Sequence, residues 1–131
     1  MNELSGSSKV LLALLVAYIV ADVLLTPVAR LETRDPALVT SLGRVTLGLL
    51  FAGLIVAIVS VVLLFRRSSR AAISAVIAAA LFFPAVLAEW TGHFSKLAPP
   101  PAVATIEVIQ ALIALSVIVV ALWAPRARST R

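Results

Sequence analysis

The sequence predicts an all-α membrane protein, an antiparallel bundle of four transmembrane helices forming one domain over residues 1–131. The first observation is composition: 62% of the residues are apolar and 13% are charged, with a mean hydropathy of +1.13. Soluble domains are typically about 45–50% apolar and about 25% charged. The second observation is that four apolar runs recur, each near the roughly 20 residues that cross a hydrocarbon core of about 30 Å. Because so few polar residues cannot cover this chain in water, lipid must be the solvent over much of its surface.

The first span is predicted over residues 10–29, after a short polar N-terminal tail of residues 1–9. A cleaved signal peptide is the alternative, but its apolar region is typically about 7–15 residues long, which is shorter than this run. We therefore expect the run to remain in the protein as a membrane span. Residues 30–43 form a charged connection in which Asp35 and Pro36 favour a turn.

The second span is predicted over residues 44–65 and is uncharged after its first residue. Its small residues form two pairs four residues apart, Gly48 with Ala52 and Gly53 with Ala57. Small residues at this spacing let two helices approach closely. We expect these pairs to pack against a neighbouring helix, without specifying a dimer.

The third span is predicted over residues 71–90, after a short basic turn at residues 66–70. Small residues at a spacing of four lie on two sides of this span and favour contact with another helix. Ala71, Ala75 and Ala79 share one side, and Ser74 and Ala78 share another. Pro84 has no backbone N–H, so we expect it to kink this helix and leave a carbonyl group for a neighbour to satisfy.

The fourth span is predicted over residues 102–124 and is followed by a basic tail of residues 125–131. The crossing that leads into it ends in three prolines, and Pro101 suits the first turn of a helix, where its missing N–H does no harm. Trp90 and Trp123 are expected at opposite interfaces of the membrane, where aromatic residues are enriched.

Lysine and arginine are unevenly distributed between the two ends of the predicted bundle. The end with both termini and the 66–70 turn carries seven of them, and the other end carries four. The seven are Lys9, Arg66, Arg67, Arg70, Arg126, Arg128 and Arg131; the four are Arg30, Arg34, Arg44 and Lys96. The positive-inside rule therefore places both termini in the cytoplasm. We expect a multi-pass protein of the plasma membrane, the inner membrane of a bacterial cell.

Composition also excludes several classes of protein. The formal net charge is +5, but the basic residues sit at the ends of apolar runs and form no basic face with interleaved aromatics, so nucleic acid is not an expected partner. The chain has no cysteine and one histidine, which excludes disulfides, zinc–thiolate sites, iron–sulfur clusters and bis-histidine haem ligation. No phosphate-binding loop and no hydrolase or zinc-protease motif is present. No cofactor or metal is expected.

Polar residues within the predicted spans gather near the outer ends of the helices. Tyr18 and Asp22 share a face of the first span, Glu107 and Gln110 share a face of the fourth, and Arg44 begins the second at the same level. An ionised carboxylate in hydrocarbon costs about 2.5–3.5 kcal/mol on insertion scales. We therefore expect both carboxylates to face inward, with Arg44 as the nearest cation, and together to form an outward-facing polar cup.

Two further interpretations concern the carboxylates. Either Asp22 or Glu107 could pair with Arg44 and serve only to fix which helices are neighbours. Glu89 and His93 form a secondary candidate site, since they are one turn apart if the third helix continues past Trp90. A single histidine makes a metal site there a weak signal, and Gly92 favours an end of the helix at this point.

Three functions are compatible with these residues. The first is a non-enzymatic ligand-binding protein or accessory subunit, in a homo-oligomer or with a partner membrane subunit. The second is a proton- or cation-coupled transporter, which would act as an oligomer because four short helices hardly enclose a pathway. The third is a membrane enzyme that acts on a lipid or quinone. The sequence favours the first and contains no catalytic motif that supports the third.

Overall fold

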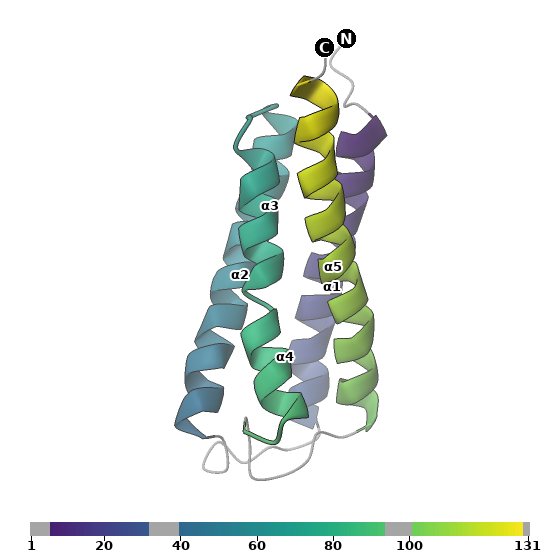
Figure 1. Cartoon of the computed structure of the whole chain (residues 1–131). Helices are drawn as coiled ribbons and strands as arrows, with labels where there is room; N and C mark the ends of the chain where they lie inside the picture. The colour runs from purple at the N-terminus through teal and green to yellow at the C-terminus, as the bar shows by residue number, and fades with distance from the viewer. Residues whose placement is uncertain (1–5, 32–39, 94–100, 130–131) are drawn as a thin grey trace.

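The computed structural model describes residues 6–31, 40–93 and 101–129, with side chains for residues 6–24, 40–93, 101 and 104–123. This part of the chain is helical and contains no strand. The helices are α1 (Gly6–Leu31), α2 (Ser41–Phe65), α3 (Ala71–Ala80), α4 (Phe83–Trp90) and α5 (Pro101–Ser129). They form the predicted four-helix bundle, in which α3 and α4 together make the third span (Figure 1).

Neighbouring helices in the bundle are antiparallel. α1 contacts α2 and α5, and α3 contacts α2 and α5, so the four spans close into a ring. Figure 1 shows both termini at one end, which we call the terminal end. The opposite end, where α1 finishes and α2 and α5 begin, is called the distal end.

The helices are longer than the apolar runs that predict them. α1 begins at Gly6, inside the predicted tail of residues 1–9, and α5 continues past Pro125 to Ser129. A helix satisfies its own backbone groups in water as well as in lipid, so hydropathy locates the lipid boundary and not the end of the helix. Pro101 begins α5, as predicted. The predicted turn at Asp35 and Pro36 lies outside the described residues.

The core of the bundle consists mainly of small side chains. Ala75, Ala78, Ala57 and Ala114 are all fully buried, as the alanine rows of the third span predict. Large apolar side chains point outward on every span and are 44–72% exposed. This inverted pattern suits lipid, because close contact between helices in a membrane comes from small residues and not from the hydrophobic effect.

Only one of the two predicted small-residue pairs on α2 lies in an interface. Gly53 and Ala57 are buried, whereas Gly48 is exposed and has nothing within 4 Å of the position that a Cβ atom would occupy. A Cβ atom on Gly53 would lie 3.0 Å from Leu81 Cβ and 3.1 Å from the Ala78 carbonyl oxygen. Gly53 therefore allows α2 to approach the third span closely.

The third span breaks next to Pro84, as predicted. α3 ends at Ala80 and α4 begins at Phe83, with Pro84 in the first turn of α4. The Phe82 amide donates to the Ala79 carbonyl at 3.2 Å, three residues back, where a regular α-helix would bond to Ala78. The Ala78 carbonyl accepts a hydrogen bond from Tyr18 of α1 at 3.4 Å. A neighbouring helix thus satisfies a carbonyl at the break.

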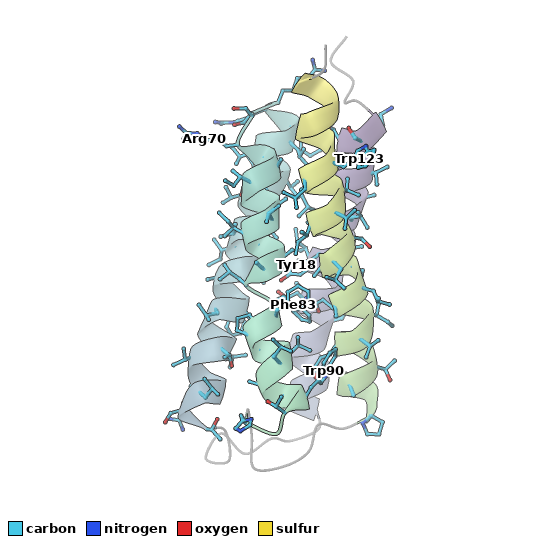
Figure 2. All side chains as sticks on the ribbon, in the orientation of Figure 1. Tyr18, Arg70, Phe83, Trp90 and Trp123 are labelled. Atoms are coloured by element: carbon cyan, nitrogen blue, oxygen red, sulfur yellow. The ribbon has the colours of Figure 1, made fainter. Side chains whose placement is uncertain are left out.

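Four spans in the described residues are long and apolar enough to cross a membrane: Gly6–Leu24, Ser41–Phe65, Ala71–Trp90 and Ala104–Trp123. Figure 2 shows Trp123 and Trp90 towards opposite ends of the bundle, and both are exposed, at 72% and 48%. These positions match the two interfaces at which aromatic side chains are enriched. The protein is therefore a small multi-pass membrane protein.

Candidate functional site

Two buried polar side chains lie on one face of α1. Tyr18 and Asp22 are one helical turn apart and only 1% and 4% exposed. Asp22 lies in the second half of α1, which runs toward the distal end. Tyr18 lies deeper, close to the middle of the bundle (Figure 2).

The facing side of α5 carries two more. Glu107 is 4% exposed and Gln110 is fully buried. Both lie within the first three turns of α5, which begins at Pro101 at the distal end. α1 and α5 pack against each other, and Gln110 lies next to Tyr18 and Asp22, while Glu107 precedes Gln110 by about one turn on the buried face of α5. We call these four buried side chains the α1–α5 polar cluster: Tyr18, Asp22, Glu107 and Gln110.

Gln110 is the central member of this cluster. Its carboxamide lies near enough to the Tyr18 hydroxyl and the Asp22 carboxylate for a weak hydrogen-bond interaction with each. Neither Gln110 Oε1 nor Gln110 Nε2, however, reaches regular hydrogen-bonding distance and angle with any described residue. A fully buried carboxamide usually has hydrogen-bond partners of regular geometry. Gln110 is therefore an exception in the described core of the bundle.

Apolar groups close the inner side of the cluster, which is the side toward the middle of the membrane. The Phe82 ring packs edge-on against the Tyr18 ring, with centroids 6.2 Å apart, and is itself buried. The Tyr18 hydroxyl lies 3.5 Å from the position of a Cβ atom on Gly53, so α2 also reaches this point. The cluster is thus bounded on its inner side by the break between α3 and α4.

Arg44 differs from these four side chains in its exposure to the surroundings of the bundle. Arg44 is exposed near the start of α2, whereas Thr46, two residues later, is buried. The inward face of α2 has a regular spacing of three or four residues: Gly43, Thr46, Leu50, Gly53, Ala57, Ser60 and Leu64. Extending the small-residue pattern of Gly53 and Ala57 back to the start of the helix would have found Thr46 on the inward face, and would have placed Arg44 off it.

The secondary pair at the distal end does not share a helix. α4 ends at Trp90, and Gly92 adopts a positive φ of 78°. The Gly92 amide bonds to the Glu89 carbonyl at 3.2 Å and the His93 amide to the Ala88 carbonyl at 2.8 Å, the pattern of a glycine-ended helix. Glu89 is half-buried, and the exposed His93 ring bonds through Nδ1 to the Thr91 hydroxyl at 2.9 Å.

These positions give no metal site of the usual kind. Among the described residues, no three histidine, aspartate or glutamate side chains come close enough together to hold a metal ion. The His93 backbone carbonyl accepts a hydrogen bond from the Thr40 hydroxyl just before α2. The contacts of His93 therefore hold the distal ends of α2 and α4 together.

Comparison with known proteins adds no assignment. No protein-family model matches the chain, and no curated protein or solved structure is significantly similar to it. The class of protein is set by the fold: a small multi-pass membrane protein with a buried polar cluster between two of its spans.

Proposed function

We propose that this protein is a non-enzymatic membrane protein that binds a small polar ligand at the α1–α5 polar cluster. The observation that carries the proposal is that Gln110 is fully buried and that neither polar atom of its side chain reaches regular hydrogen-bonding geometry with a described residue. Leaving a buried donor or acceptor unsatisfied costs about 1–3 kcal/mol. A ligand that bonds to the carboxamide would offset this cost, and it would explain why an apolar residue does not occupy the position.

The surroundings favour a small ligand. All members of the cluster are at most 4% exposed, and Phe82 and Gly53 close its inner side. Asp22 and Glu107 lie in the distal halves of α1 and α5, so the distal surface of the membrane is the nearer one. By the positive-inside rule this surface is the outer one. The protein would bind there as a homo-oligomer or as a subunit beside a partner membrane protein.

The test is the thermal stability of purified protein in detergent, measured with four probes: sodium chloride, ammonium chloride, choline acetate and acetamide. We expect at least one probe to raise the wild-type Tm saturably, because a ligand that binds only the folded state stabilises it. Gln110→Leu should lose this response. Its own Tm without a probe should equal or exceed that of the wild type, since an unsatisfied carboxamide has been removed.

The matched control is Ser116→Ala on the same helix. Ser116 is exposed, and its hydroxyl bonds to the Leu112 carbonyl of its own helix at 2.8 Å. This variant should respond to the probes as the wild type does. If no probe separates the wild type from Gln110→Leu, the protein does not bind a ligand at this cluster.

The break between α3 and α4 favours a second candidate, a cation- or proton-coupled transporter. Transporters often place their sites beside interrupted helices near the middle of the membrane, and Tyr18 of the cluster contacts the break through the Ala78 carbonyl. Asp22→Asn or Glu107→Gln should then abolish the flux of the cation or proton into proteoliposomes while leaving the Tm unchanged. If Asp22 or Glu107 serves only as a structural partner of Arg44, we expect the opposite result. Each variant then lowers the Tm, and a matching change of Arg44 partly restores it.

A further inference from the structure

The short turn between α2 and α3, residues 66–70, is strongly basic. Its three arginines, Arg66, Arg67 and Arg70, are all exposed. Figure 2 shows the Arg70 side chain reaching outward from the terminal end of the bundle. Among the described residues, the carboxylates lie in the distal half: Asp22, Glu89 and Glu107. No described carboxylate is therefore close enough to offset the charge of Arg66 or Arg70.

The backbone of this turn has a conformation that glycine would suit better than arginine. Arg67 has a φ of 57°, in the left-handed region. The Ser68 amide donates to the Leu63 carbonyl at 2.9 Å and the Arg67 amide to the Leu64 carbonyl at 3.0 Å. This pattern ends a helix with one left-handed residue, which is usually glycine because a Cβ atom disfavours the conformation. An arginine at such a strained position indicates a role for its side chain.

The turn lies where lipid meets water. The second span ends at Phe65 and the third begins at Ala71, so the five residues of the turn connect two membrane spans directly. Phe65 and Ile73, on either side of it, are 64% and 63% exposed. The polar headgroups of a bilayer form a layer just outside its hydrocarbon core. A connection this short keeps its arginines in that layer.

We propose that residues 66–70 bind the phosphate group of an anionic phospholipid. A guanidinium group can hold phosphate through two parallel hydrogen bonds, and basic residues beside a membrane span attract anionic lipids. A lipid is favoured over free phosphate because the exposed Phe65 and Ile73 side chains offer apolar contact to the acyl chains of the same molecule. The site is independent of the α1–α5 polar cluster and of the ligand proposed there.

The test is the Tm of purified protein in a non-ionic maltoside detergent, with three probes: dihexanoyl phosphatidylglycerol, dihexanoyl phosphatidylcholine and sodium phosphate. We expect only phosphatidylglycerol to raise the Tm saturably, because a ligand that binds the folded state stabilises it. The double variant with Arg66→Gln and Arg70→Gln should bind this lipid about 25-fold more weakly, which is about fivefold for each arginine.

The matched control is Lys9→Gln, which removes an exposed positive charge at the same end of the bundle, but on α1. It should keep the wild-type response, and so should Gln110→Leu. Arg67→Gly separates binding from folding. Glycine suits the left-handed backbone, so the Tm without lipid should be at least that of the wild type, whereas the response to phosphatidylglycerol should weaken.

Four results would overturn the proposal. Equal stabilisation by the two lipids would show that the turn does not select charge, and a saturable response to sodium phosphate would show that it takes the free ion. An equal loss of response in Lys9→Gln would assign the attraction to the whole terminal end. If the double variant does not fold, Arg66→Gln and Arg70→Gln are measured separately, and an unchanged response in both is the fourth such result.

Discussion

Gly53 shows how one residue supports the cluster without belonging to it. It brings the backbone of α2 against the Ala78 carbonyl, the same atom that accepts the hydrogen bond from Tyr18. Any side chain at this position would press on the break in the third span. Close packing of α2 and the position of the Tyr18 hydroxyl are therefore coupled through a single backbone oxygen.

We predict that Gly53→Ala lowers the free energy of unfolding by about 1–3 kcal/mol, the usual cost of overpacking. The new Cβ atom would lie 3.1 Å from a backbone oxygen and 3.0 Å from Leu81 Cβ, so the helices must move apart. Reversible unfolding in mixed detergent micelles measures this change.

Gly48→Ala is the control on the same helix, because it makes the same chemical change in open space. Alanine is the better helix former by about 1 kcal/mol, so this variant should be neutral or more stable. Equal destabilisation by both substitutions would contradict the assignment of Gly53 to the interface.

At the scale of the elements, one polar contact joins α2 to α3 in the terminal half of the bundle. Ser60 Oγ donates to the Val56 carbonyl at 2.8 Å and lies 2.6 Å from Ser74 Oγ. A hydroxyl has one proton, so Ser74 must be the donor to Ser60. The α2–α3 pair is thus held by a directed hydrogen bond in addition to its alanines.

We predict that Ser74→Ala costs about 0.6 kcal/mol, the average found for hydrogen bonds between membrane helices. Ser60→Ala should cost a similar amount, and the double variant should cost little more than either one, because all three remove the same bond. Thermodynamic cycles in micelles measure the coupling. Additive losses would show that the two hydroxyls do not interact.

The α3–α4 break is the element that connects the fold to the cluster. Because Pro84 cannot donate a hydrogen bond, the helix is interrupted at the depth of Tyr18 and Phe82. The interruption presents a backbone carbonyl to α1 and turns the Phe82 ring onto Tyr18. A continuous helix would use that carbonyl internally, and the inner boundary of the cluster would change.

At the scale of the whole molecule, both termini and the basic α2–α3 turn lie at one end. Figure 2 shows Arg70 at this end, opposite Trp90. Arg66, Arg67 and Arg70 are all exposed there. The charge bias predicts that this end faces the cytoplasm.

The absence of cysteine makes this orientation simple to measure. Ser41→Cys at the distal end and Ser69→Cys in the α2–α3 turn both replace exposed serines. With a membrane-impermeant maleimide on intact cells, we expect Ser41→Cys to be labelled and Ser69→Cys to react only after the cells are opened. The reverse pattern would invert the protein and place the cluster near the cytoplasmic surface.

The sequence by itself determined the number of spans, their antiparallel order and the break at Pro84. It also identified Asp22, Glu107, Gln110 and Tyr18 as polar groups within spans, because polar side chains in hydrocarbon are too costly to face lipid. These features depend on transfer free energies and backbone chemistry, which act locally along the chain. Hence they can be predicted before any packing is known.

Only the tertiary structure decided which faces meet. It buried Gly53 and exposed Gly48, buried Thr46 and exposed Arg44, and joined the Tyr18 hydroxyl to the Ala78 carbonyl. In a membrane the lipid is as apolar as the core, so hydropathy cannot tell the inside of a helix from its outside. Complementary shape between helices makes that choice, and it is a property of the assembled bundle.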